Sequence, residues 1–261
     1  MASLPDFFLI NPTAWNFIVW DRFNVPRNYT FAPTKLQKHE GIDLRATDDH
    51  NNPVTVFAAQ RGIVDKVGYS AGGYGNYVRI VHKWGDQTYV TWYGHLSSTT
   101  ALAGQFVLAG QKIGIAGTTG FSTGVHLHLT LQHIGHGLSN YVVADVVDPE
   151  PYFRLDGGPE FEEAWFVNDI TIPDGTKLTP GETFVKTWQI RNTGTTTWTN
   201  QYTLGHAGDE KMGAADAISV ITDQVRPGQL TNVSVNFIAP TTPGKHVTTW
   251  MMCNAANDPF P

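Results

Sequence analysis

The sequence has little cysteine and little charge. Its 261 residues include one cysteine, Cys253, which excludes an internal disulfide and a zinc site built from several thiolates. Charged residues make up 15% of the chain, the net formal charge is -6, and the Lys and Arg residues form no cluster that would neutralise phosphates. We therefore expect no nucleic-acid partner.

Long apolar runs are also missing. No stretch reaches the roughly 18 consecutive apolar residues that a membrane-spanning helix requires. The N-terminal residues lack a basic region followed by a hydrophobic segment, which is the pattern of a secretory signal peptide. The sequence therefore predicts no membrane span, and the chain as written has no export signal.

The composition favours strands over helices. Hydrophobic residues make up 41% of the chain, and 26 glycines and 15 prolines accompany them, which is typical of many short strands joined by turns. A length of 261 residues predicts one or two domains.

The segment Gly-Val-His-Leu-His-Leu at residues 124–129 places two histidines two positions apart. Successive side chains of a strand alternate between faces, so His126 and His128 point to one side while Leu127 and Leu129 enter the core. Such a pair alone is more often two polar positions of a strand than a metal site. The assignment therefore depends on the neighbouring motifs.

Two other segments carry histidines. His39 and Asp43 stand four residues apart, but the glycine and the β-branched Ile42 between them disfavour a helix, so we expect the pair where a loop enters a strand. Together with a histidine of the pair they give a three-ligand set, which leaves the fourth tetrahedral position of zinc open, as in catalytic sites. A third segment, Tyr-Gly-His-Leu, adds His95.

A longer series of motifs surrounds these residues. It comprises His39–Asp43, Pro53–Val54, Ala58–Ala59, Gly62–Val64, Gly72–Asn76, Val78–Ile80 with His82, Tyr93–Leu96, Gly110–Gly114 and Thr119–His128. In this order and spacing, residues about 37–135 resemble the lysostaphin-type (LytM) zinc endopeptidases, which cut peptides of bacterial cell walls. Val125 stands where that family usually has proline, and Leu129 where it usually has an aromatic residue. Neither departure removes a chemical group.

The resemblance implies a role for each site residue. His39, Asp43 and His128 match the zinc ligands, with one Zn²⁺ per chain, and His126 and His95 match two histidines that flank the metal and its water. A group that accepts the proton of the water and a group that stabilises the developing oxyanion are needed beside the metal, and neutral imidazole suits both tasks near physiological pH. We assign His126 as the general base and His95 to orienting the water or stabilising the tetrahedral intermediate.

Other polar groups have simpler interpretations. His133 and His136 lie beside glycines and are expected to be solvated loop residues rather than a second metal site. His82 is expected at the surface or behind the ligands. The glycine-rich run at 71–75 predicts a hairpin turn, and the acidic run at 48–52 lacks the ligand spacing of a calcium loop.

The second half of the chain is expected to be a separate domain. The sequence turns polar and glycine-rich around residue 156, as a boundary does. We predict a peptidase domain at 1–155, a linker at 156–164 and a second domain at 165–261. Alternating segments such as 184–190 and 232–238, separated by turn signals, are typical of a β-sandwich.

Residues 165–261 carry a second set of motifs, namely Asp174–Leu178, Pro180–Gly181, Trp188, Arg191–Gly194, Trp198, Met212–Gly213, Pro227–Gly228, Ala239–Pro240, Pro243–Gly244 and Trp250. They resemble the four-tryptophan immunoglobulin-like domain of selective-autophagy cargo receptors and bacterial surface proteins. Three of the four tryptophans are present, so either the sandwich ends one strand short or the natural gene continues. We expect an all-β protein, with an antiparallel β-sheet peptidase domain and an immunoglobulin-like β-sandwich whose tryptophans lie in the core.

Two functions remain open. The first is a zinc endopeptidase that hydrolyses cross-bridge or stem peptides of peptidoglycan, with a C-terminal domain that binds or tethers. The alternative is a non-catalytic wall-binding or hydrolase-regulating protein on the same fold, but the intact five-residue set favours catalysis.

The expected partners are peptidoglycan peptides and, for the second domain, a protein or wall ligand. Because that substrate lies outside the cytoplasm, we expect an extracellular or cell-envelope location. The chain is then a fragment of a longer exported protein or an enzyme released by other means. The sequence does not indicate an oligomeric state.

Overall fold

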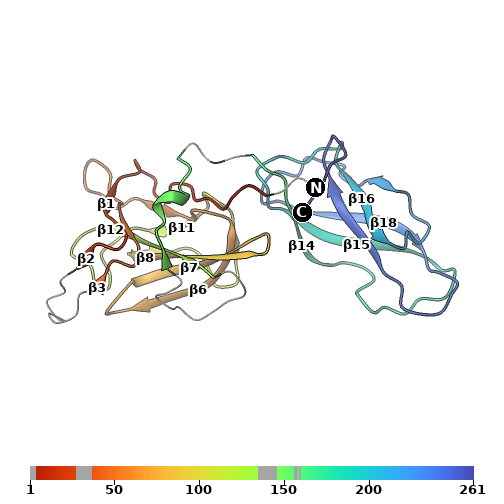
Figure 1. Ribbon diagram of the computed structural model, residues 1–261, viewed down its shortest axis with the longest axis horizontal. Helices are drawn as coiled ribbons and strands as arrows, with labels where there is room; N and C mark the ends of the chain where they lie inside the picture. The colour runs from red at the N-terminus through yellow and green to blue at the C-terminus, as the bar shows by residue number, and fades with distance from the viewer. Residues whose placement is uncertain (1–3, 28–36, 135–145, 156–157, 159) are drawn as a thin grey trace. The chain divides into compact units, whose positions relative to one another are not determined.

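The computed structural model describes residues 4–27, 37–134, 146–155, 158 and 160–261 (Figure 1). The chain separates into two compact units, one at Asp6–Gly158 and one that contains Pro159–Pro261. The described residues form strands and turns, with one short 3-10 helix, η2, at Glu150–Tyr152. The predicted all-β fold is confirmed, and no helix in the described ranges has the length and hydropathy to span a membrane.

The first unit is built on an eight-stranded sheet with the order β1-β4-β12-β8-β7-β6-β10, and β13 pairs with β12. Its neighbouring strands pair antiparallel. The strands of this sheet are β1 (Val19–Asp21), β4 (Ile42–Arg45), β12 (His126–His133), β8 (Gln87–Leu96), β7 (Gly75–Trp84), β6 (Gly62–Ser70), β10 (Phe106–Val107) and β13 (Val146–Val147). Two smaller sheets contain β5 (Thr55–Phe57), β11 (Lys112–Ile115) and β9 (Ser98–Thr99), and β2 (Pro26–Arg27) and β3 (Gln37–Lys38).

The central strand β12 has one apolar and one polar face. Its three leucines, Leu127, Leu129 and Leu131, have no exposed surface. Leu127 pairs with Leu44 and Leu129 with Ile42 of β4, and burial of each such side chain contributes about 1.5–3 kcal/mol. The predicted alternation is confirmed, because the leucines anchor the sheet and the histidines lie on the opposite face.

A β-bulge ends strand β8. Asn76 of β7 pairs with Leu96 while Val78 pairs with Tyr93, so Gly94 and His95 together face one residue of β7. His95 has a positive φ of 61°, and its N–H donates to the carbonyl of Tyr74 at 2.6 Å. Regular alternation would place the His95 side chain on the face opposite to His128, and the bulge turns it back.

The turn before β7 lies against the loop that precedes β12. Gly75 and Gly120 have positive φ values of 62° and 73°, which glycine adopts without strain. A Cβ on Gly120 would lie 2.2 Å from the nitrogen of Gly75. The Thr119 hydroxyl accepts a hydrogen bond from the Asn76 N–H and donates one to the carbonyl of Leu96, both at 2.9 Å. These contacts fix the loop to β7 and β8.

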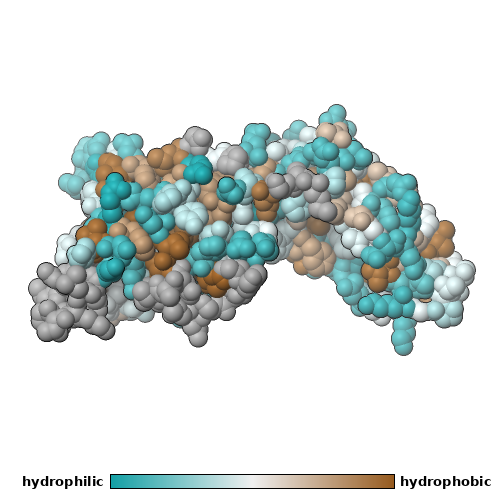
Figure 2. Space-filling view, viewed as in Figure 1, coloured by the Kyte–Doolittle hydropathy of each residue, from teal (hydrophilic) through white to brown (hydrophobic). Residues whose placement is uncertain are grey.

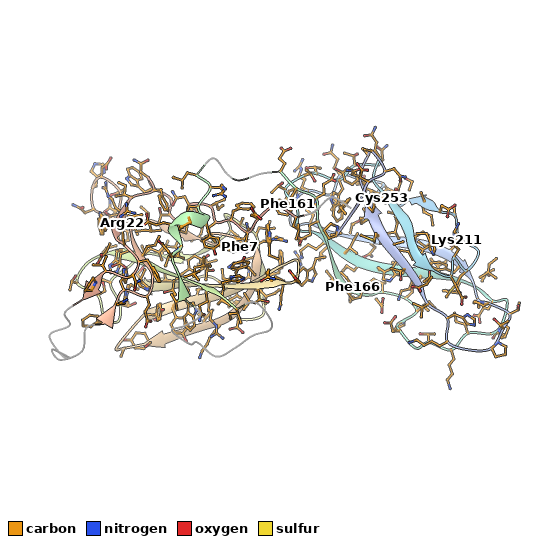
Figure 3. The ribbon with its side chains drawn as sticks, in the orientation of Figure 1. Phe7, Arg22, Phe161, Phe166, Lys211 and Cys253 are labelled. Carbon is orange, nitrogen blue, oxygen red and sulfur yellow. The ribbon has the colours of Figure 1, made fainter. Side chains whose placement is uncertain are left out.

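The N-terminal residues complete the first unit. Phe7, Phe8 and Leu9 are buried, and β1 adds an edge strand beside β4. Arg22 directly follows β1, and its guanidinium forms an ion pair with Glu150 of η2 (Figure 3). The segment therefore caps the sheet and places the backbone of Arg22 beside the start of β4.

The second unit is a β-sandwich. One sheet contains β14 (Ala164–Asp169), β15 (Thr183–Asn192) and β18 (Leu230–Ile238), and the other contains β17 (Ala217–Ser219), β16 (Thr203–Asp209), β19 (Thr248–Cys253) and β20 (Pro259–Phe260). Residues of both sheets share one core, with Trp198 fully buried and Trp188 and Trp250 packed against it. The tryptophans are therefore structural, as predicted.

On the face seen in Figure 2, hydrophobic residues are scattered among hydrophilic ones, which is normal for a protein surface.

Candidate metal centre

Three ligand atoms meet on the polar face of the first unit's sheet. His39 Nε2 lies 2.9 Å from His128 Nδ1 and 3.1 Å from Asp43 Oδ1, and His128 Nδ1 lies 2.9 Å from the same carboxylate oxygen. Asp43 and His128 are register partners on β4 and β12, and His39 precedes β4. All three residues are buried. The loop-to-strand position expected for His39 and Asp43 is confirmed.

In each imidazole, one ring nitrogen faces the cluster and the other, the outer nitrogen, faces away from it. The hydrogen-bond partner of the outer nitrogen indicates which nitrogen carries the proton. His39 Nδ1 lies 2.9 Å from the carbonyl of Arg22, which only accepts, so in the neutral ring the proton is on Nδ1 and Nε2 faces the cluster with a lone pair. His128 Nε2 lies 3.0 Å from the hydroxyl of Thr130, and Nδ1 faces the cluster. Backbone and hydroxyl groups thus aim both imidazoles at one point.

The carboxylate of Asp43 is held in its charged form. Burial raises its pKa, but the close contacts with His128 and His39 outweigh burial, and the pKa falls well below its usual range. Burial lowers the pKa of His128, which the bond to Asp43 opposes only in part. The cluster therefore holds an ionised carboxylate beside an imidazole, His128, whose neutral state burial favours.

This donor set fits a divalent metal ion. Ligand atoms bound tetrahedrally to zinc at 2.0–2.1 Å are about 3.3 Å apart, close to the spacing of the three atoms here. Three lone pairs that converge in a buried site repel one another unless a cation or proton lies between them. Two imidazoles and one carboxylate are also the ligand types of a borderline-soft ion with an open fourth position.

Two further histidines flank this cluster. His126 lies on β12, its Nδ1 is 2.8 Å from the carbonyl of Gly124, and its Nε2 is 3.6 Å from Asp43 Oδ1. The His95 ring centroid lies 4.6 Å from that of His126, and His95 Nδ1 donates to the carbonyl of Thr119 at 2.8 Å. Both rings, when neutral, turn a lone pair on Nε2 toward the centre.

His95 stays neutral over the physiological range. Burial lowers its pKa to about 4, although the bond to the Thr119 carbonyl opposes the shift. His126 retains more solvent contact, with 12% of its side chain exposed. One flanking imidazole is thus buried and neutral, and the other is partly exposed.

All five residues singled out in the sequence for the metal site therefore meet in one place. His82 was expected at the surface or behind the ligands. The surface position is wrong, since His82 is completely buried, and its ring bonds to the Arg61 carbonyl and the Thr91 hydroxyl rather than to a ligand of the cluster. His133 is not in a loop either: it ends β12, bonds to Gln87 and stacks on Tyr89. His136 lies outside the described residues.

Sequence reasoning missed the groups that orient the histidines. Thr130 could have been found, because it stands two residues after His128 and therefore on the same face of β12. The carbonyls of Arg22, Thr119 and Gly124 could not, since main-chain acceptors carry no residue-specific signal.

Comparison with known proteins places both units in families. Residues 37–140 match Peptidase family M23, and residues 171–261 match the Ig-like domain from next to BRCA1 gene. An uncharacterized metalloprotease of Haemophilus influenzae is 37% identical over 109 residues, which cover 42% of this chain and 22% of that protein. Lysostaphin of Staphylococcus staphylolyticus is 32% identical over 134 residues, which cover 51% of this chain and 26% of lysostaphin.

Protein ILRUN of Danio rerio is 36% identical over 90 residues, covering 34% of this chain and 31% of that protein. The chain thus spans less than a third of the length of these three relatives. Among solved structures, the catalytic domain of lysostaphin from Staphylococcus simulans aligns with a TM-score of 0.42 and 27% identity, covering 52% of this chain and 91% of that domain. Residues 37–140 form a domain of the lysostaphin-type M23 peptidase family, and residues 171–261 form an immunoglobulin-like domain.

Proposed function

We propose that this protein is a zinc-dependent endopeptidase that hydrolyses peptide bonds of bacterial peptidoglycan. The observation that carries the proposal is the convergence of His39, Asp43 and His128 on one point, with two more imidazoles beside it. Zinc bound by these three residues would supply Lewis acidity and lower the pKa of a water to about 7. The match to a peptidase family agrees with this chemistry.

The two flanking histidines would then have different roles, one in proton transfer and one in orienting the water. His126 is accessible and presents Nε2 to the centre, so it suits the general base that takes a proton from the attacking water and returns it to the leaving amine. His95 is buried and neutral, and its fixed Nε2 suits a group that accepts a hydrogen bond and orients the water. This division assigns one proton acceptor and one positioning group to the reaction.

The test is cleavage of purified sacculi of several chemotypes, with new amino termini identified by mass spectrometry. The expected result is new termini at a cross-bridge glycine or a D-amino-acid linkage, lost on addition of a chelator and restored by zinc. A His128→Ala variant serves as the matched protein control. Binding to sacculi without any new terminus would favour the non-catalytic alternative.

We propose a binding or tethering role for the second unit. Its tryptophans lie in the core, so ligand contact would fall to other residues. A module that holds the enzyme at an insoluble wall raises its effective concentration there. A chain ending at residue 155 should then digest walls more slowly while cleaving soluble peptides at the full rate. A cell-envelope or extracellular location follows from the proposed substrate.

A further inference from the structure

The four histidines of the metal centre differ in what holds their outer nitrogen. In His39, His95 and His126 this nitrogen faces a backbone carbonyl, at 2.9, 2.8 and 2.8 Å respectively. In His128 it faces the hydroxyl of Thr130, at 3.0 Å. A carbonyl can only accept a hydrogen bond, whereas a hydroxyl can donate or accept. His128 is thus the histidine whose proton position its partner does not fix.

A second hydroxyl continues this contact. The Tyr74 OH lies 2.9 Å from Thr130 Oγ1, and the Tyr74 ring meets that of His128 edge-on at 5.3 Å. Thr130 has no exposed surface, and the Tyr74 ring stacks on Trp92 at 5.1 Å. Packing therefore holds both hydroxyls in place, and their hydrogens can still rotate.

Metal binding changes which ring nitrogen of His128 must carry the proton. Without metal, His128 Nδ1 lies 2.9 Å from the Asp43 carboxylate, so a proton on Nδ1 donates to it and Nε2 needs a donor. With metal, Nδ1 must offer a lone pair, so the proton moves to Nε2, which then needs an acceptor. A carbonyl beside Nε2 would satisfy one of these states, and a hydroxyl satisfies both.

We propose that Thr130 and Tyr74 are positioning residues that reverse their hydrogen bonds when the metal centre is loaded. In the metal-free form Tyr74 donates to Thr130 and Thr130 donates to His128 Nε2. In the loaded form His128 Nε2 donates to Thr130 and Thr130 donates to Tyr74. The inference rests on the proposed zinc site and adds the means by which a buried ligand exchanges its tautomer without an unpaired polar atom.

The first experiment measures zinc affinity by chelator competition in the full chain. Thr130→Val removes the hydroxyl while keeping the shape, and we expect zinc to bind about 10–100-fold more weakly, the usual effect of losing such a partner. Thr130→Ser should restore the affinity, and Tyr74→Phe should give a smaller loss because Thr130 can still accept.

Thr91→Val is the matched control. Thr91 is also a buried threonine whose hydroxyl bonds to a histidine, His82, at 2.8 Å, but His82 lies outside the metal cluster. This variant should lose stability and keep its zinc affinity. Equal zinc affinities in the wild type and Thr130→Val, or equal losses in Thr130→Val and Thr91→Val, would overturn the inference.

Ring ¹⁵N NMR of His128 gives a second, independent measurement. We expect the proton on Nδ1 in the metal-free protein and on Nε2 in the zinc-loaded protein. Should Thr130→Val fail to fold, this spectrum and the Tyr74→Phe affinity still decide the matter, and a proton on Nε2 in both states would refute the reversal. A wild-type chain that binds no zinc would instead overturn the proposed function, and the inference with it.

Discussion

The two units bury polar groups in opposite ways. In the second unit, buried Lys186 donates to the Asp169 carboxylate at 2.5 Å and to the carbonyl of Ile172 at 2.6 Å. In the first unit, two acceptors, His39 Nε2 and Asp43 Oδ1, lie 3.1 Å apart, and His128 Nδ1 lies 2.9 Å from each. The second unit pairs its buried charge with a counter-charge of its own, whereas the first brings together acceptors that a cation would balance.

This difference indicates which buried groups serve stability and which serve function. A buried charge with its own counter-charge is explained by folding alone. A buried cluster in which acceptors outnumber donors costs free energy in the metal-free protein and is expected where binding or catalysis maintains it.

The largest effect is expected for Asp43→Ala. Removing the carboxylate eliminates one inner bond to zinc and the charge that offsets the ion, so bound zinc is lost and turnover falls by more than about four orders of magnitude. Metal analysis and peptide cleavage measure both. Asp49→Ala is the control, because its side chain is 72% exposed and should retain zinc. Full zinc occupancy in Asp43→Ala would remove the basis of the comparison.

The next effect concerns His126→Ala. This ring faces the cluster at 3.6 Å without being one of the three convergent ligands, so the variant should keep its zinc and lose about two to four orders of magnitude in turnover. Zinc content and steady-state rates, measured on one preparation, distinguish this outcome from ligand loss. A fall in zinc content as large as in Asp43→Ala would make His126 a ligand.

A smaller effect is expected for the pH dependence of stability. Burial lowers the pKa of His82 from 6.5 to about 4, although the Arg61 carbonyl opposes the shift. Between these values the unfolded chain binds more protons than the folded one, so stability falls as pH is lowered from 6.5 toward 4. The shift corresponds to about 3 kcal/mol, present in the metal-free wild type and absent in His82→Gln. Denaturant unfolding of both proteins at pH 7 and pH 4.5 measures it, and parallel losses would disprove it.

The smallest effect is expected in the second unit. Lys186→Met leaves the carboxylate of Asp169 without its partner and should destabilise this unit by about 1–3 kcal/mol. Zinc affinity and cleavage of soluble peptides should not change. Lys211→Met provides a comparison, because its ion pair with Asp216 is solvent-exposed and its loss should change stability little. A change in zinc affinity in Lys186→Met would contradict the separation of the two roles.

Simple periodicity predicted much of the first unit. The alternation of His126, Leu127 and His128 placed the polar and apolar faces of β12 correctly, because period-two patterning fixes the faces of any strand. The same rule fails at His95, which lies two residues after Tyr93 and would share its face. The bulge at Gly94 and His95, with a positive φ at His95, reverses that orientation. Its position was assigned through the family resemblance, not through strand geometry.

Burial was harder to predict than position. His82 follows an alternating strand segment and was expected near the surface, but Phe7 packs its ring against it from the N-terminal segment. Contacts between segments so far apart in sequence are set by tertiary packing, which local patterns do not encode. The acceptor of the His39 proton belongs to the same class, because Arg22 lies 17 residues from His39.

The contact between Gly75 and Gly120 defines where this protein can be re-engineered. No side chain fits between the two glycines, and the adjacent Thr119 supplies the carbonyl that holds His95. Phe121 and Thr123 follow directly and have exposed side chains. A loop exchange should therefore keep the chain through Gly120 and vary these two positions, so that the histidine cluster is left unchanged.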